Sequence, residues 1–188
     1  MDRGSIQSGA IAAALLAGAA GAGDKGSFQV TPYLGMSSVK VEGRYLEFGT
    51  TDNLDQWQAG IAASYRAPFG LVLEIGKSAT GDLYIGWLTG GEVRETYGAV
   101  GYDFRLAHGW HLAPKIGLTR WRLEGSEFED LVGDSGELRE SLDGDDPYVE
   151  LAVDKEFNPH IGIGLSLRHA DVEFGHVQSI AFKFIWTL

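Results

Sequence analysis

Apolar and polar residues alternate with a period of two along most of this 188-residue chain, and this alternation is its strongest constraint on folding. The run at 161–168, IGIGLSLR, has Ile or Leu at every odd position and Gly, Ser or Arg at every even position. Successive side chains of a β-strand point to opposite faces, so such a run predicts a strand with one apolar face. Eight runs of this kind occur, at 29–36, 57–66, 71–76, 97–104, 110–119, 148–154, 161–168 and 179–188. No segment from residue 23 onward keeps the 3.6-residue apolar period of an amphipathic helix, so we expect an all-β fold.

The links between these runs differ in length in a regular way. Short links occur at 67–70, 106–109 and 158–160. Long links occur at 37–56, 78–91 and 122–147, with a shorter one at 171–176. Short turns at one rim and long loops at the other are typical of a membrane barrel, whose tilted strands need about 9–11 residues to cross the hydrocarbon. We therefore predict a single-domain, eight-stranded antiparallel up-and-down transmembrane β-barrel.

The two faces of the predicted strands differ sharply in chemistry. One face has Leu, Ile, Val, Phe and Trp almost without charge, and the other has Gly, Ala, Ser, Thr and charges of both signs. A soluble small-ligand barrel, which is the alternative, would turn the apolar face inward and cover its outside with charge. The many small residues of the polar face suit the narrow interior of eight strands better than a solvated exterior. We therefore expect the apolar face to contact lipid.

The charged residues expected inside the barrel should pair, because an ionised group buried alone is very costly. Those that we expect in one interior ion-pair network are Glu74, Lys115, Glu150, Arg168 and Lys183. Plugging of the interior is the simpler interpretation of this network. A conducting pore or a proton relay is the alternative that the residues leave open.

Aromatic residues should gather at both membrane interfaces, as is usual in membrane barrels. Because the strands alternate in direction, those expected at the short-turn rim are Tyr65, Phe69, Phe104, Trp110, Phe157 and Trp186. Those expected at or near the opposite rim are Trp57, Tyr84 and Trp87. Two separate girdles would support the placement of lipid outside the barrel.

The first residues indicate a targeting signal rather than a part of the fold. Residues 10–22 (AIAAALLAGAAGA) are apolar and end in small residues, with Ala20 and Ala22 spaced as an A-x-A cleavage signal. We therefore predict a signal peptide at 1–22 and a barrel domain at 27–188, with a buried N-terminal helix as the alternative for the first segment. The formal net charge of −11 disfavours nucleic-acid binding, and the absence of cysteine excludes disulfides and thiolate zinc sites.

Four local strings and the C-terminus point to a known family. The strings are VTPYLGM at 30–36, LVLEIG at 71–76, TYGAVGYDF at 96–104 and LAPKIGL at 112–118. They resemble strings of the OmpA/OmpX-like eight-stranded outer-membrane β-barrel family. The C-terminal SIAFKFIWTL is similar to the signature that the outer-membrane assembly machinery reads, although it ends in Leu188 instead of Phe or Trp. The resemblance implies a monomeric, integral protein of the bacterial outer membrane with a closed interior, and it leaves the biochemical role open.

Three basic residues have lipid-facing parity at the ends of neighbouring strands that are expected to lie at the long-loop rim. They are Lys77, Arg94 and Arg120. A cation at this rim can meet anionic headgroups, and lipopolysaccharide phosphates are the expected partner. We predict a lipopolysaccharide-binding stripe, with ordinary snorkelling or loop solvation as the alternative.

The link at 122–147 is strongly acidic, with ten acidic residues against two basic ones and hence a net charge of −8. Its Asp143-Gly144-Asp145-Asp146 string lacks a full calcium-loop pattern. We interpret the segment as a solvated acidic loop, and divalent-cation binding is the alternative.

One histidine raises the question of an enzyme. His169 has lipid-facing parity, and the segment around it faintly resembles outer-membrane lipid A deacylases, which have a His-x-Ser pair on their outer surface. Asp171 stands here where that pattern has serine, and Ser166 and Ser179 have inward parity. A serine hydrolase needs a hydroxyl beside its base, so a lipid A deacylase is only the alternative function.

The leading prediction for function is a non-enzymatic barrel. It would serve envelope integrity, lipopolysaccharide binding, or surface adhesion through a ligand at its long extracellular loops. The remaining histidines considered, His108, His111 and His160, lie near the short-turn rim without metal-ligand spacing. We therefore expect no catalytic residues, no metal ion and no cofactor.

Overall fold

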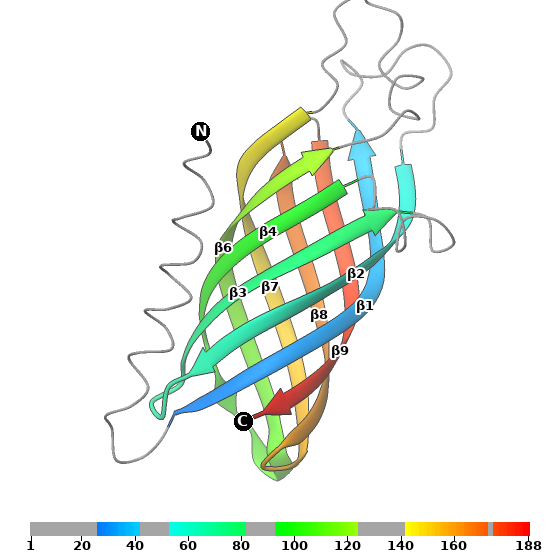
Figure 1. Cartoon of the computed structure of the whole chain (residues 1–188). Coiled ribbons are helices and arrows are strands. Elements are labelled where there is room, and N and C mark those ends of the chain that lie inside the picture. The colour runs from blue at the N-terminus through cyan, green and yellow to red at the C-terminus, as the bar shows by residue number, and fades with distance from the viewer. Residues whose placement is uncertain (1–25, 42–52, 82–92, 124–141, 173–174) are drawn as a thin grey trace, which may run out of the picture.

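A computed structural model of the chain describes residues 26–41, 53–81, 93–123, 142–172 and 175–188. Nine β-strands and one short 3-10 turn occur in these ranges (Figure 1). The strands are β1 (Ser27–Val41), β2 (Asn53–Arg66), β3 (Leu71–Gly81), β4 (Val93–Tyr102), β5 (Phe104–Arg105), β6 (Trp110–Leu123), β7 (Leu142–Asn158), β8 (Ile161–Val172) and β9 (Gly175–Thr187). The 3-10 turn η3 spans Ala107–Gly109. None of the described residues forms a helix long and apolar enough to cross a membrane.

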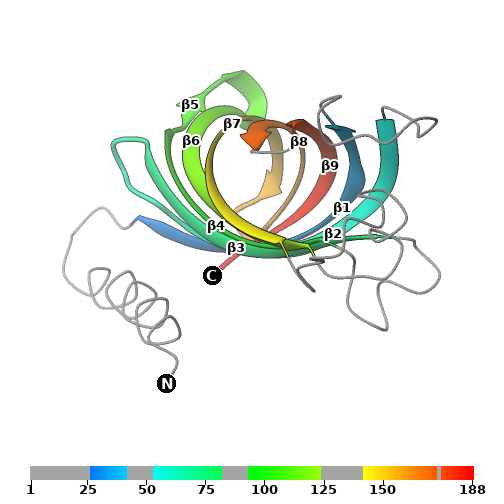
Figure 2. The ribbon, with the colours of Figure 1, turned by 90° about the horizontal axis from the view of Figure 1, so that it is seen from above.

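The strands close into a ring. Each long strand pairs antiparallel with its neighbours in the chain, β1 pairs with β9, and β4 pairs with β6. The two-residue β5 continues the line of β4 along β6, so eight long strands make up the barrel. Figure 2 shows these strands arranged in a ring around the barrel axis. Closure leaves no long strand with an unpaired edge, and the predicted eight-stranded antiparallel fold is confirmed.

The alternating apolar and polar residues of each strand lie on the outer and inner faces of the barrel, respectively. On β6, Ile116 and Leu118 are 63% and 66% exposed, whereas Lys115 and Thr119 are 6% and 3% exposed. The same division holds around the ring, where Leu, Ile, Val and Phe side chains form the outer surface. The apolar face is therefore outside, as predicted, and the soluble barrel with an apolar interior is wrong.

The short connections all lie at one rim, where β1 begins and β9 ends (Figure 1). Gly70 closes the β2–β3 turn with a φ of 100°, a conformation that suits glycine. The Asn158 carboxamide oxygen accepts hydrogen bonds from the backbone N–H groups of His160 (2.8 Å) and Ile161 (3.0 Å), which closes the β7–β8 turn. Local turn chemistry therefore matches the short links expected from the sequence.

The strands reach further toward the opposite rim than the apolar alternation indicates. The segment from 142 to 147, expected as part of the acidic loop, is the beginning of β7, and β6 continues to Leu123. That expectation was wrong because backbone pairing continues where the outward side chains become polar: Arg120 lies opposite Asp145, and Arg122 opposite Asp143. Residues 124–141 lie outside the described residues.

The outward aromatic residues follow the expected arrangement at the short-turn rim. Phe69, Phe157 and Trp186 are 68%, 60% and 57% exposed, and Phe104 and Trp110 are also exposed. At the other end Trp57 is 41% exposed. Tyr84, Trp87 and the predicted signal peptide at 1–22 lie outside the described residues.

Candidate functional site

The middle of the barrel contains a buried chain of ion pairs. The Lys115 ammonium donates to Glu74 (2.7 Å) and to Glu150 (2.9 Å). Glu150 also accepts from the Arg168 guanidinium at 3.1 Å, and Arg168 reaches Glu95 at 3.4 Å. The structure therefore brings together four of the five residues expected in the interior network, and adds Glu95, which that expectation lacked.

Two tyrosines hold the Arg168 guanidinium in place. Its central carbon lies 4.1 Å from the ring centre of Tyr97 and 4.4 Å from that of Tyr148. Both rings occupy space above glycines of the neighbouring strands, since Tyr97 pairs with Gly76 and Tyr148 pairs with Gly117. A Cβ atom on either glycine would clash with the tyrosine ring. Sequence reasoning missed this pair of tyrosines, and an inward tyrosine opposite an inward glycine was the available signal.

A second ionic cluster fills the lumen near the short-turn rim. Arg66 contacts Glu156 at 2.9 Å and Asp103 at 3.4 Å, and the His111 Nδ1 atom lies 3.0 Å from Asp103. Lys183 belongs here, because its ammonium lies 2.8 Å from Asp154, which also contacts Arg66 at 3.6 Å. The interior charges are thus divided between two clusters, which we call the middle cluster and the turn-side cluster.

A small cavity lies beside the middle cluster. It has a volume of about 10 Å³, which is enough for roughly one water molecule. Its lining includes Tyr33, Glu74, Tyr97, Glu150 and Arg168. In the described part of the barrel, this region has side chains where a conducting pore would need open space.

The outer rim opposite the short turns has a cationic side. Lys77, Arg94 and Arg120 are exposed on β3, β4 and β6. Cross-strand pairing joins Lys77 to Thr96 and Thr96 to Arg120, so Lys77 and Arg120 lie in one row. Arg94 lies on the same face of β4, two residues before Thr96. The three predicted stripe residues therefore share one outer surface.

The adjoining side of this rim is acidic. The Arg120 guanidinium contacts the Asp145 carboxylate at 3.1 Å, and both side chains are more than 60% exposed. Asp143, two residues before Asp145, is also exposed. The cationic stripe thus borders outward carboxylates of β7.

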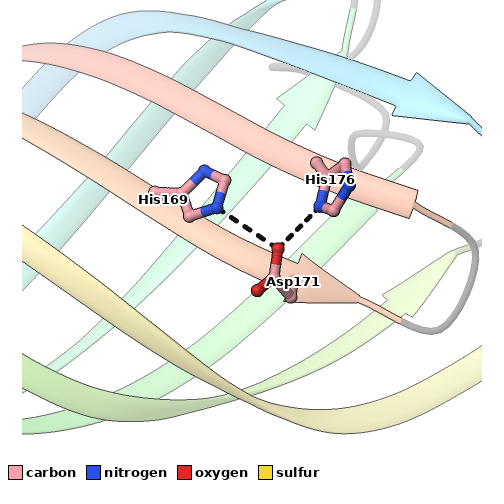
Figure 3. Close-up of side chains that lie close together, drawn as sticks. All are labelled: His169, Asp171 and His176. Atoms are coloured by element: carbon pink, nitrogen blue, oxygen red, sulfur yellow. Dashed lines mark hydrogen bonds and ion pairs between the residues drawn. The ribbon is translucent and has the colours of Figure 1, made fainter.

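A third group of side chains lies on β8 and β9. The Asp171 Oδ1 atom is 3.2 Å from His169 Nε2 and 2.6 Å from His176 Nδ1 (Figure 3). His169 and Asp171 were considered together from the sequence, whereas His176 was not among the expected site residues. His176 is the cross-strand partner of Asp171, and this pairing of β8 with β9 is what brings the second imidazole to the carboxylate.

The other histidines and the inward serines lie elsewhere. His111 is buried in the turn-side cluster, whereas His108 and His160 are exposed at the short-turn rim. Ser166 and Ser179 line the interior cavity, on the opposite side of the sheet from His169. The structure therefore does not bring these serine hydroxyls to the histidine.

A closed barrel with an apolar exterior and an ion-paired interior is a transmembrane β-barrel. The chain belongs to the family of outer membrane protein β-barrel domains, whose model matches residues 8–184. It is accordingly an integral protein of the outer membrane. No curated protein sequence matches it.

Solved structures with the same fold include three outer-membrane barrels. Neisserial surface protein A (NspA) superposes with a TM-score of 0.58 at 12% identity, covering 86% of this chain and 96% of that one. The N-terminal barrel domain of Pseudomonas aeruginosa OprF gives a TM-score of 0.56 at 11% identity, covering 86% and 100%. Ail of Yersinia pestis, in complex with the heparin analogue sucrose octasulfate, gives 0.54 at 13% identity, covering 87% and 99%. At these identities the likeness concerns the fold alone.

Proposed function

We propose that this barrel is a non-enzymatic outer-membrane protein that binds lipopolysaccharide through Lys77, Arg94 and Arg120. The observation behind the proposal is the placement of these three cations on one exposed surface of β3, β4 and β6. They lie toward the strand ends that lead into the long connections, above the apolar band that includes Ile116 and Leu118. A ligand of the stripe would therefore have both an apolar part and an anionic part.

Lipopolysaccharide has both parts, because it contains acyl chains as well as phosphates. A guanidinium binds phosphate through two parallel N–H donors, and an ammonium binds it as a compact charge. Near an anionic membrane surface each Lys or Arg contributes about 1 kcal/mol to attraction. Three such cations beside an apolar surface would hold the phosphates of a lipid whose acyl chains lie against the strands.

The Arg120–Asp145 ion pair is an internal competitor for phosphate at the stripe. Ion pairs between exposed side chains contribute only about 0–1 kcal/mol, since both partners stay well hydrated. Arg120 can therefore exchange Asp145 for a phosphate at little cost. Lys77 has no carboxylate within ion-pair distance among the described residues.

The complex of Ail with sucrose octasulfate supports the choice of a polyanionic ligand. It shows that a barrel of this fold can bind a compact molecule with many anionic groups. Surface adhesion through the connections at 42–52, 82–92 and 124–141 stays a prediction, because these segments lie outside the described residues.

The test replaces all three cations with glutamine (Lys77→Gln, Arg94→Gln and Arg120→Gln) and measures the lipopolysaccharide retained per purified barrel. We expect retention to fall several-fold. Arg105→Gln is the matched control, because Arg105 is an equally exposed arginine at the opposite rim, with a side chain that is 61% exposed. Equal retention in the triple variant and the native protein would contradict the proposal.

A lipid A deacylase is the weaker proposal, because His169 faces outward and Ser166 and Ser179 face the lumen. An assay for fatty-acid release from lipid A by the purified barrel separates the two functions. Release that disappears with His169→Ala would replace the non-enzymatic role with the enzymatic one.

A further inference from the structure

We propose that His169, Asp171 and His176 bind a divalent transition-metal ion of the Zn²⁺ type on the outer surface of the barrel. The site joins β8 to β9 at the rim opposite the short turns. It is separate from the cationic stripe, which lies on β3, β4 and β6, and it does not depend on lipopolysaccharide binding.

The β8–β9 hairpin brings the three ligands together. Asp171 and His176 are direct cross-strand partners, and His169 lies two residues before Asp171 on the same outward face. Figure 3 shows both imidazoles directed at the carboxylate from opposite sides. The two rings are stacked, with centroids 5.9 Å apart and planes inclined by 23°. One nitrogen of each ring and one carboxylate oxygen lie within 4.8 Å of one another.

These distances are close to those of a tetrahedral zinc site. Zinc–nitrogen and zinc–oxygen bonds of about 2.0–2.1 Å place neighbouring ligand atoms about 3.3 Å apart. The His169 Nε2–Asp171 Oδ1 distance is already 3.2 Å. The His176 Nδ1–Asp171 Oδ1 distance of 2.6 Å must open by about 0.7 Å to reach that spacing. The side chains are 43%, 68% and 48% exposed, so rotamer changes of this size meet little resistance.

The donor set selects the class of metal. Two imidazoles and one carboxylate suit Zn²⁺ and its transition-metal neighbours, whereas Ca²⁺ and Mg²⁺ prefer oxygen ligands alone. The ion would replace the present contacts, in which the single Oδ1 atom of Asp171 serves both histidines. Three protein ligands also leave a fourth position for water or for an anionic group from outside the protein.

The test is a Zn²⁺ titration of the full-length, tag-free barrel, folded in detergent and stripped of metal with a chelator. Calorimetry should show one equivalent bound, and substitution with Co²⁺ should give the visible absorption of a tetrahedral nitrogen–oxygen site. The double variant His169→Gln/His176→Gln should bind Zn²⁺ at least roughly 10–100-fold more weakly. Asp171→Asn should weaken binding while both imidazoles remain.

His160→Gln is the matched control, because His160 is an exposed histidine at the opposite rim, where its Nδ1 atom contacts the Thr187 carbonyl oxygen. This variant should bind Zn²⁺ as the native barrel does. Heat-modifiable gel migration verifies that each variant is folded, and the single histidine variants replace the double variant if it does not fold. Undiminished Zn²⁺ affinity in the folded variants, or displacement of Zn²⁺ by an equal concentration of Ca²⁺, would overturn the proposal.

Discussion

The interior and the outer rim use the same ionic groups in opposite surroundings. Lys115 and Glu150 lie 2.9 Å apart inside the barrel, and each side chain is 4% exposed. Arg120 and Asp145 lie 3.1 Å apart at the rim, and their side chains are 65% and 62% exposed. The distances are similar, but only the rim pair has water to replace a lost partner.

The difference in exposure separates the charges that maintain the fold from those that are available to a ligand. Removing one partner of a buried pair leaves an uncompensated charge in a region of low dielectric constant. Removing one partner of an exposed pair leaves a hydrated side chain. We therefore expect substitutions in the middle cluster to lower the stability of the barrel, and substitutions at the rim to change ligand binding.

The largest effect is expected for Glu150→Leu, which deprives Lys115 and Arg168 of their shared carboxylate. The free energy of unfolding should fall by about 3–5 kcal/mol, as for other broken buried pairs. A urea titration of the barrel folded in lipid vesicles, followed by tryptophan fluorescence, measures it. A loss below about 1 kcal/mol would mean that the middle cluster contributes no more to stability than an exposed ion pair at the rim.

The next largest effect is expected for Ile116→Arg. Ile116 is 63% exposed near the middle of β6, on the face assigned to lipid. An arginine on the lipid face near the bilayer midplane costs about 2–4 kcal/mol, and this cost falls toward the interfaces. The same urea titration applies, with Ile116→Met as the control. An unchanged free energy of unfolding would mean that this face of β6 does not contact lipid.

A smaller effect is expected for Arg168→Lys, which keeps the charge near Glu150 and loses the planar group between Tyr97 and Tyr148. Lysine cannot stack on both rings, so the free energy of unfolding should fall by about 1–2 kcal/mol. Arg168→Met tests the charge itself and should lower the free energy of unfolding further than Arg168→Lys does. If the lysine and methionine variants lose equal amounts, stacking rather than charge explains the role of Arg168.

The smallest change in stability is expected for Asp145→Asn, within about 1 kcal/mol, because the pair with Arg120 is exposed. This variant should nevertheless retain more lipopolysaccharide, since Arg120 no longer has a competing carboxylate. Lipopolysaccharide retained per barrel is the measurement. Lower retention would mean that Asp145 positions Arg120 for its ligand instead of competing for it.

The faces of the strands were predictable from the sequence. The parity of Ile116 and Leu118 against Lys115 and Thr119 is a local property of β6, and the backbone geometry of any strand turns it into two faces. The strand ends at the rim opposite the short turns were less predictable. From Leu142 to Pro147, β7 has no apolar alternation, and its pairing with β6 became visible only in the folded barrel.

The partners of the interior charges were only half predictable. The inward parity of Lys183 follows from its position in the sequence, but its pairing with Asp154 instead of Glu150 depends on how β7, β8 and β9 are staggered. The turn-side cluster around Arg66 was missed for the same reason, since its members come from strands far apart in the chain.

The strands, their apolar outward faces and the alternation of short turns with longer connections could all be predicted from the sequence. These properties depend on residues close together in the chain, whose geometry is the same in every strand. The folded barrel was needed to show which charges meet and that His176 lies beside His169 and Asp171. Those contacts depend on strand register and barrel closure, which place residues from different strands within a few ångströms of one another.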